Sequence, residues 1–391
     1  MPADAERHRL VREALAASQF DALICRLPES VVLLSGCYPI IEQTVVVFPV
    51  DGEPALILPR QEEYLAASTG IGDVRPFDCW RLGDPPPSES LKRLLGQVCA
   101  EHRLSGQAVG YEDDFTSFAP PQMSAEPPML GNAWGSMLRA VVGADLAPAT
   151  ELLHQLRARK TSLEVERLRL ANRVACLGLE AFKTEAQPGR TEAEIGAAVE
   201  RTVLARGVGC DGARSARGWA QVMSGPRTES AWYYPVSTDR RIAAGDLVLI
   251  ELGVVVDGYW SDLTRTVVAG RSTDRQREVY DAVRRAQAAD LAACQPGARG
   301  DQVDAVGRRI LESAGLGQYF VHHTGHGIGF RYHEPYPWLH PDSRQTLQAG
   351  NVHSIEPGVY IPGFGGIRLE DDAVELIGGA EFLSATDFGL D

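Results

Sequence analysis

The first 110 residues alternate between strand-like and helix-like patterns of hydrophobic positions. Residues 20–27 and 44–59 are rich in apolar and β-branched side chains, which favour strands. Asp51-Gly52 within the second range is a common hairpin turn. The first 18 residues instead space their apolar and charged side chains as an amphipathic helix does. This alternation predicts a small α/β domain at the start of the chain.

A helical pattern separates this segment from the rest of the chain. Residues 149–183 have helical periodicity with one interruption, where Thr161 and Glu164 have the spacing of a capping box that starts a new helix. A length of 391 residues also exceeds one ordinary core, since domains hold roughly 100–200 residues. We therefore predict one domain over 1–155 and a larger one over 160–391.

The pattern after this boundary alternates groups of helices with groups of strands. It predicts helices at about 162–186 and 191–206, strands near 218–224 and 246–269, a helix pair over about 273–315, and strands near 351–376. Elements grouped in this way are typical of an α+β domain, with helices on one side of a mostly antiparallel sheet. We expect that architecture for the larger domain.

The segment VVVDGYWSDLTRT, 254–266, predicts a β-hairpin with acids on a face that is otherwise apolar. A two-residue turn at Asp257-Gly258 gives the expected pairs Val256–Tyr259, Gly253–Asp262 and Glu251–Thr264. Because side chains alternate along a strand, Glu251 and Asp262 become diagonal neighbours on one face, roughly 7–8 Å apart. Two interpretations follow: one acid pairs with an arginine such as Arg265, or a cation lies between the acids.

Three further segments supply groups that can bind a cation. Glycines flank His326 on both sides, so the backbone there can approach a bound group closely. Glu356 ends a short apolar strand, and Glu370 lies on an alternating segment, 365–376, whose Arg368 shares its face. With the hairpin acids the set has four carboxylates and one imidazole, which suits Mn²⁺, Co²⁺ or Fe²⁺, with Zn²⁺ as an alternative. Two divalent ions would balance its four negative charges.

The composition narrows the classes of partner. Asp and Glu outnumber Lys and Arg by 52 to 38, and a net charge of −14 argues against non-specific binding to nucleic acid or anionic membrane. Seven scattered cysteines without a CxxC pair predict neither a disulfide framework nor a cysteine zinc site. The chain has no run of about 18 apolar residues and no apolar signal core, so we expect a cytoplasmic protein.

Five blocks of the sequence resemble the pita-bread metallohydrolases: Xaa-Pro aminopeptidases, Xaa-Pro dipeptidases (prolidases) and methionine aminopeptidases. The blocks are GDLVLIELG, GYWSDLTRTVV, HHTGHGIG, HEP and SIEPGVYIPGFGGIRLEDD, and they occur in the family's order. The resemblance covers about 160–391, and residues 1–155 look like the creatinase-type N-terminal domain of the longer members. It implies an α+β protein, in which a C-terminal pita-bread fold follows a smaller α/β domain.

The resemblance also implies a role for particular residues. The family's metal-ligand positions fall on Glu251, Asp262, His326, Glu356 and Glu370. It implies two divalent ions, most commonly Mn²⁺ or Co²⁺, and a metal-bridged hydroxide that attacks an amide carbonyl. Glu356 falls on the general base, and His323 and His333 on the histidines that bind substrate or the oxyanion. Arg368 is expected among the substrate-binding residues with Trp232, His323 and His333, and it could also orient Glu370 from outside the ligand set.

Two positions depart from the family pattern. The family normally has Asp at its first ligand, where this chain has Glu251, whose extra methylene moves the carboxylate by about 1.5 Å. Prolidases and Xaa-Pro aminopeptidases typically have a substrate-binding histidine in the block SGPNSALPHYxP. Without gaps that histidine aligns with Trp232 of SGPRTESAWYYP, and a one-residue slip of the alignment is the alternative. Tryptophan offers one N–H donor and a large apolar wall to a substrate.

Three functions are compatible with these residues. The first is a dinuclear peptidase that removes the N-terminal residue from short Xaa-Pro peptides, as a homodimer. The second is a non-peptidase enzyme of the same fold, namely a C–N hydrolase like creatinase or ectoine hydrolase, or a dimethylsulfoniopropionate lyase. Glu251 and Trp232 favour this alternative, and the otherwise intact ligand set argues against its metal-free members. The third is an inactive binding module, like the histone-chaperone relatives of the fold.

Overall fold

The structure is a computed structural model, and it describes residues 4–41, 43–113, 132–143, 146–230, 236–386 and 389–391. The chain divides into two compact units, Met1–Arg157 and Ala158–Asp391. None of the described helices is both long enough and apolar enough to cross a membrane.

The first unit is built on a six-stranded mixed sheet with the strand order β4-β3-β2-β1-β5-β6. Its strands are β1 (Ala22–Cys25), β2 (Val45–Pro49), β3 (Ala55–Pro59), β4 (Asp73–Phe77), β5 (Val109–Tyr111) and β6 (Leu146–Pro148). Its helices are α1 (Ala5–Ala16), α2 (Pro28–Ser35), η1 (Arg60–Glu62), α3 (Glu63–Ala66), α4 (Pro87–Glu101) and α5 (Asn132–Val142), and α6 (Thr150–Ala158) follows them. The hairpin predicted at Asp51-Gly52 forms, since β2 and β3 pair antiparallel.

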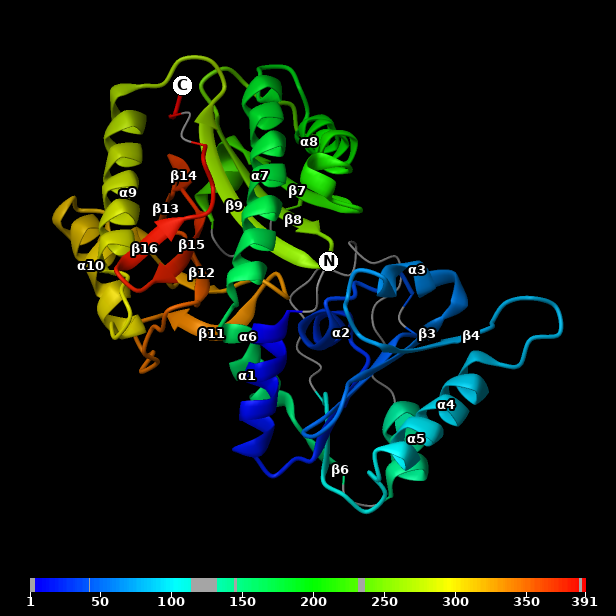
Figure 1. The fold of residues 1–391 in the computed structure, drawn as a ribbon. Helices are drawn as coiled ribbons and strands as arrows, with labels where there is room; N and C mark the ends of the chain where they lie inside the picture. The colour runs from blue at the N-terminus through cyan, green and yellow to red at the C-terminus, as the bar shows by residue number, and fades with distance from the viewer. Residues whose placement is uncertain (1–3, 42, 114–131, 144–145, 231–235, 387–388) are drawn as a thin grey trace. The chain divides into compact units, whose positions relative to one another are not determined.

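The second unit joins helices to antiparallel strands (Figure 1). Its helices are α7 (Ser162–Glu185), α8 (Glu192–Gly207), η2 (Cys210–Gly212), η3 (Gly225–Glu229), α9 (Asp274–Ala293), α10 (Gly300–Ser313) and η4 (Gly317–Tyr319). Its strands are β7 (Ala216–Ser224), β8 (Leu247–Val256), β9 (Tyr259–Val268), β10 (Gly325–Gly327), β11 (Glu334–Leu339), β12 (Val352–Ile355), β13 (Gly358–Ile361), β14 (Gly365–Arg368), β15 (Asp371–Leu376) and β16 (Gly379–Phe382).

These strands form three sheets, ordered β7-β8-β9, β11-β10-β12-β15-β16 and β13-β14. The apolar stripes of α7 and α8 pack on the first sheet, where Val174 and Val199 join a buried cluster with Ile250 and Leu252. Helix α9 packs through Val283 and its neighbours against β13 and β14. Burial of these side chains removes apolar surface from water, which is the main force that fixes the helices on the sheets.

The start of α7 follows the predicted capping box. Thr161 Oγ1 accepts a hydrogen bond from the Glu164 amide at 3.3 Å, and Glu164 Oε2 accepts one from the Thr161 amide at 2.8 Å. Both acceptors satisfy amides that have no partner within the helix.

The hairpin β8–β9 has the register predicted from its turn. Val256 lies opposite Tyr259, Gly253 opposite Asp262, and Glu251 opposite Thr264. The turn residues have φ of 48° at Asp257 and 91° at Gly258, the left-handed conformation that a two-residue turn of this kind requires.

The segment 365–376 departs from the single alternating strand that its sequence predicts. It forms β14, which pairs with β13, and then β15, which pairs with β12 and β16. Glu370 lies between the two strands and makes an isolated bridge with Thr264 of β9. The chain changes sheets at this point, and the change carries Glu370 to the acidic face of the hairpin.

A buried ion pair supports the turn before β11. Lys160 Nζ lies 2.7 Å from Glu334 Oε2, and the two side chains are 0% and 1% exposed. Glu334 Oε1 also accepts hydrogen bonds from the amides of Phe330 at 2.8 Å and Arg331 at 3.3 Å. This carboxylate therefore fixes the backbone that presents His333.

We expect Lys160→Met to destabilise the protein by roughly 3–5 kcal/mol, because it leaves the Glu334 charge buried without its partner. Chemical denaturation measures the loss. Lys183→Met is the matched control at an exposed position of α7, and we expect it to change stability by less than about 0.5 kcal/mol. Equal losses in the two variants would contradict the assigned role of the pair.

Candidate metal centre

The two acids of the hairpin do converge on one point, and a tyrosine hydroxyl occupies it. The Tyr332 oxygen lies 2.6 Å from Glu251 Oε1 and 2.8 Å from Asp262 Oδ1. The Thr264 hydroxyl, which also lies on this face, is 3.2 Å from Glu251 Oε2 and 2.7 Å from Glu370 Oε2, within hydrogen-bond distance of both. The hairpin face thus gathers three carboxylates through neutral donors.

The five predicted ligands form one cluster. One ligand atom each from Glu251, Asp262 and Glu370 lies within 4.8 Å of the others, and the same holds for His326, Glu356 and Glu370. Glu370 belongs to both groups and links them. The side chains come from β8, β9 and β10, from the residue after β12, and from the connection between β14 and β15.

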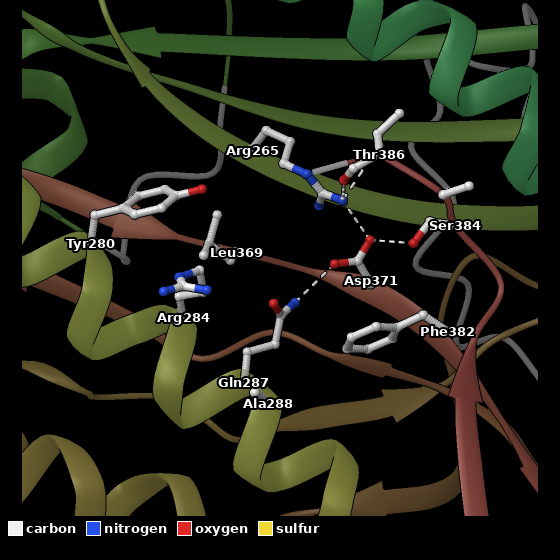
Figure 2. A pocket seen from close by; sticks show the side chains of 11 residues that line it. Arg265, Tyr280, Arg284, Gln287, Ala288, Leu369, Asp371, Phe382, Ser384 and Thr386 are labelled. Atoms are coloured by element: carbon white, nitrogen blue, oxygen red, sulfur yellow. Dashed lines mark hydrogen bonds and ion pairs between the residues drawn. The ribbon is translucent and has the colours of Figure 1, made fainter. Parts of the chain in front are cut away.

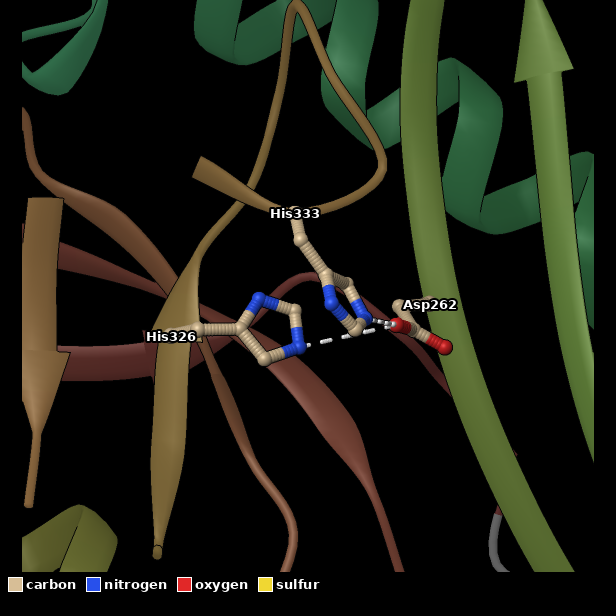
Figure 3. Close-up of side chains that lie close together, drawn as sticks. All are labelled: Asp262, His326 and His333. Carbon is tan, nitrogen blue, oxygen red and sulfur yellow. Dashed lines mark ion pairs between the residues drawn. The ribbon is translucent and has the colours of Figure 1, made fainter. Parts of the chain in front are cut away.

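His326 is oriented with one ring nitrogen toward Asp262 (Figure 3). Its Nδ1 lies 2.9 Å from the Gly327 carbonyl and donates to it, which leaves the lone pair on Nε2. His326 Nε2 lies 3.7 Å from Asp262 Oδ2 and 3.5 Å from Glu356 Oε1. His333 reaches the same acid, with Nε2 3.4 Å from Asp262 Oδ2. His333 therefore lies beside the proposed ligands, and one ligand atom each from Asp262, His326 and His333 lies within 4.8 Å of the others.

Burial perturbs every carboxyl group of the cluster. It raises the pKa of Asp262 and of Glu356 well above the usual range, and the neighbouring charge of Glu370 adds to both shifts. It also raises the pKa of Glu370 to about 7, although Arg368 opposes that shift. A cation among these groups would stabilise their charged forms, so cation binding would release protons.

The histidines of the site are neutral near pH 7. Burial lowers the pKa of His323 to about 4, with a contribution from His340, and that of His333 to about 3. It lowers the pKa of His326 well below the usual value. A neutral imidazole offers one lone pair and one N–H donor, so these rings can bind a cation or donate to an oxygen.

Two carboxylate oxygens in the cluster have no hydrogen-bond partner among the described residues. They are Asp262 Oδ2 and Glu370 Oε1, and both are buried. A buried oxygen without a partner costs free energy, and a bound cation removes that cost. The oxygen-rich donor set with a single oriented imidazole suits a divalent ion, so the residues fit a metal centre.

The sequence of this unit matches the model of metallopeptidase family M24 over residues 166–374, slightly more than half of the chain. The chain belongs to family M24. The matched range contains all five residues of the cluster, and membership of family M24 implies a metal-dependent peptidase.

The relatives of the chain include an Xaa-Pro dipeptidase and a probable dipeptidase. The chain is 36% identical over 237 residues to the Xaa-Pro dipeptidase of Pyrococcus furiosus, a match that covers 61% of this chain and 66% of the relative. It is 32% identical over 339 residues to the probable dipeptidase PepE of Mycobacterium tuberculosis, which covers 86% and 82%. The chain thus spans just under two thirds of the first relative and more of the second.

Solved M24 structures match the whole chain. The Xaa-Pro dipeptidase from Bacillus anthracis has a TM-score of 0.79 at 26% identity, with 98% of each chain covered. The prolidase from Pyrococcus horikoshii has a TM-score of 0.78 at 26% identity, with 99% of this chain and 100% of that chain covered. These matches confirm the predicted fold, an N-terminal α/β domain followed by a pita-bread catalytic domain, and the protein is a prolidase-like M24 hydrolase.

The arginine near Glu251 is a different one from the predicted candidate. Arg265 points to the other face of β9 and pairs with Asp371 at 2.6 Å, whereas Arg368 makes an ion pair with Glu251. Arg368 also donates hydrogen bonds to Thr264 Oγ1 at 3.1 Å and to the Tyr360 hydroxyl at 2.9 Å, so the predicted orienting effect on Glu370 would pass through Thr264. Glu370 contacts the same Thr264 hydroxyl, and the charge of Arg368 opposes the rise that burial causes in the pKa of Glu370.

Arg265, on the opposite face of β9, supports the backbone of the proposed ligand Glu370. It lines a cavity of about 380 Å³ together with Asp371, Gln287 and Ser384 (Figure 2). Its guanidinium donates to the Glu370 carbonyl at 2.7 Å, and Asp371 accepts from Gln287 at 3.0 Å. These bonds fix the backbone of Glu370, so that its carboxylate projects toward Thr264.

Sequence patterns did not reveal three polar residues of the site. His322 Nδ1 donates to the His323 carbonyl at 2.8 Å, so His322 Nε2 accepts from the Tyr360 hydroxyl at 3.0 Å. Tyr360 in turn accepts from Arg368, and Tyr332 joins the hairpin acids. His322 and Tyr332 are each next to a histidine in the sequence, and Tyr360 follows the EPG block. The neighbouring residues do not indicate where the two tyrosine hydroxyls point. Trp232 lies outside the described residues.

We expect Glu251→Asp to retain or raise peptidase activity, because it restores the shorter ligand of the family and removes a carboxylate held by Arg368. The measurement is kcat/KM at saturating Mn²⁺. The comparison is Glu251→Ala, which has no carboxylate at this position. Complete loss of metal from Glu251→Asp would show that the centre is built around the longer side chain.

Proposed function

We propose that this M24 chain removes the N-terminal residue from short peptides in which proline follows the cleaved bond. The observation that carries the proposal is the convergence of five ligand side chains around two buried carboxylate oxygens that accept no hydrogen bond from the described residues. The similarity to Xaa-Pro dipeptidases supports the class of substrate.

The proposed ligands are Glu251, Asp262, His326, Glu356 and Glu370, and Mn²⁺ or Co²⁺ suits them best. The arginine beside Glu251 supplies one positive charge, so the four carboxylates leave three formal negative charges for bound ions. Two divalent ions would lower the pKa of a water molecule between them and polarise the substrate carbonyl.

We assign the proton transfer to Glu356. Its side chain is 12% exposed, so a water molecule and a substrate can reach it from outside the cluster. As general base it would take a proton from the attacking water and return it to the leaving proline nitrogen. Ser354 donates to Glu356 Oε1 at 3.4 Å and limits its rotation.

We assign His323 and His333 to the substrate. His323 Nε2 lies 3.6 Å from Glu356 Oε1, and 32% of the His323 side chain is exposed. Because both rings are neutral, each can donate one hydrogen bond to a carbonyl oxygen as negative charge develops on it. We propose that Arg368 contributes indirectly, through the position of Glu251.

A peptide panel tests this function. The protein is freed of metal with a chelator, reloaded with Mn²⁺ or Co²⁺, and assayed with Xaa-Pro dipeptides, Xaa-Pro tripeptides and peptides without proline. We expect metal-dependent release of the first residue from Xaa-Pro substrates. Metal-loaded protein that cleaves none of these peptides would contradict the proposal.

We expect Trp232→His to increase the preference for Xaa-Pro over other peptides, since the family's substrate histidine aligns with this position. The measurement is the ratio of kcat/KM values for Ala-Pro and Ala-Ala. Tyr233→His controls for a histidine placed one residue away. An unchanged ratio in Trp232→His would contradict either the alignment or the role.

A second candidate is a non-peptidase C–N hydrolase or a lyase of the same fold. The ion pair between Glu251 and Arg368 favours it, because one ligand carboxylate is already neutralised by protein. Two bound ions without cleavage of any peptide would support this candidate, and retained peptidase activity would exclude it.

A further inference from the structure

A buried tyrosine stands between two of the proposed ligands. Tyr332 is 1% exposed, and its hydroxyl lies 2.6 Å from Glu251 Oε1 and 2.8 Å from Asp262 Oδ1. We propose that Tyr332 is a positioning residue of the metal centre, whose hydroxyl holds Glu251 and Asp262 in place and thereby sets the affinity for the ion that they bind. This inference rests on the function proposed above.

The ring of Tyr332 is held by three aromatic neighbours and lies close to Gly253 of β8. It stacks on His333 with centroids 4.6 Å apart and an angle of 14°. The edges of Trp219 and Trp260 meet it at 5.6 Å each. A Cβ atom at Gly253 would lie only 2.8 Å from the ring, so the glycine leaves the space that the ring fills. The hydroxyl therefore has a fixed position.

A fixed hydroxyl matters more for glutamate than for aspartate. The side chain of Glu251 has one more rotatable bond than aspartate, and a free carboxylate would lose more conformational freedom when a cation binds. Here Tyr332 holds Oε1, while Thr264 and Arg368 hold Oε2. Beside its bond to Tyr332, Glu251 Oε1 keeps a lone pair for a cation, so the hydroxyl orients this oxygen without blocking it.

Calorimetric titration of the metal-free protein with Mn²⁺ alone, without substrate, tests the inference. Tyr332→Phe keeps the ring and its stacking and loses only the hydroxyl. We expect the affinity for one of the two Mn²⁺ ions to fall by about 10-fold and the affinity for the other ion to stay unchanged. Loss of a residue that hydrogen-bonds a metal ligand typically lowers affinity by about 10- to 100-fold, and we expect the lower end of that range. The Mn²⁺ concentration for half-maximal activity should rise by the same factor, while kcat at saturating Mn²⁺ stays near the wild-type value.

Two comparisons separate positioning from a purely structural role. Tyr319→Phe removes a hydroxyl from η4, outside the cluster, and we expect it to leave both affinities unchanged. In a Glu251→Asp background the effect of Tyr332→Phe should shrink, because the shorter carboxylate no longer reaches the hydroxyl. A structural role would lower the denaturation midpoint and leave the Mn²⁺ dependence unchanged.

If Tyr332→Phe binds both ions with wild-type affinity, the inference about Tyr332 is overturned and the proposed function is not affected. The same holds if Tyr332→Phe lowers Mn²⁺ affinity as much in the Glu251→Asp background as in the wild type. Absence of Mn²⁺ binding by the wild-type protein would instead contradict the proposed function, and this inference with it.

Discussion

Replacing Glu356 with glutamine is expected to reduce kcat by about 10³-fold or more, because general base catalysis alone is worth roughly 10²–10⁴-fold. Glutamine has nearly the same shape and can still donate and accept hydrogen bonds, but it cannot take a proton from water. It is also a weaker ligand, so the assay is carried out at saturating Mn²⁺ with Xaa-Pro dipeptides. Steady-state kinetics and the metal content of the same sample give the result.

The metal content identifies which role of Glu356 is lost. If the variant retains its ions and loses kcat, the proton transfer depends on this carboxylate. If it loses an ion as well, the residue is also an essential ligand. More than a few per cent of wild-type kcat in the glutamine variant would remove Glu356 from the role of base.

The second large effect is expected for Asp262→Asn, which should lower metal affinity by more than about 100-fold. Loss of a direct ligand should cost more than loss of a residue that only hydrogen-bonds a ligand. Asp262 is fully buried, and its Oδ2 has no hydrogen-bond partner among the described residues. Turnover should be lost along with the metal. Metal content after dialysis and kcat/KM measure the two effects.

The same substitution is expected to leave the metal-free protein at least as stable as the wild type. The charges of Glu370, Asp372 and Glu356 all oppose ionisation of Asp262, so a neutral asparagine relieves repulsion. Asp290→Asn is the matched control, since Asp290 is equally buried but lies on α9 outside the cluster. We expect this control to keep its metal. Loss of metal from both variants would point to a general disturbance of the fold.

Local rules were enough to predict the scaffold of the site. The turn at Asp257-Gly258 determines the register of β8 and β9, and the register places Glu251 and Asp262 on one face. The capping box at Thr161 determines where α7 begins. These features depend on residues that are close in sequence, so their patterns can be read without knowledge of the fold.

Contacts between distant segments could not be predicted in this way. The alternation in 365–376 favours one strand, yet the chain crosses from β14 to β15 at Glu370, because Thr264 of β9 offers a bridge. The partner of Arg368 depends on that crossing. No local pattern distinguishes Tyr332, and its role depends on the space left by Gly253, 79 positions earlier in the chain. Such choices are made by tertiary packing and not by periodicity.

The site therefore combines a predictable ligand set with neutral and cationic groups that hold it. Carboxylates whose pKa values are raised by burial and mutual repulsion are costly in the metal-free protein. Tyr332, Thr264 and Arg368 offset part of this cost and keep the ligands close together. This arrangement prepares the centre for cations before they bind.

The most direct test of the central claim is the number of Mn²⁺ ions that each folded chain retains, measured by elemental mass spectrometry after loading and removal of unbound ions. The account predicts about two ions per chain for the wild-type protein and a loss of ions in Asp262→Asn. A folded wild-type protein that retains no Mn²⁺, Co²⁺, Fe²⁺ or Zn²⁺ under these conditions would contradict it.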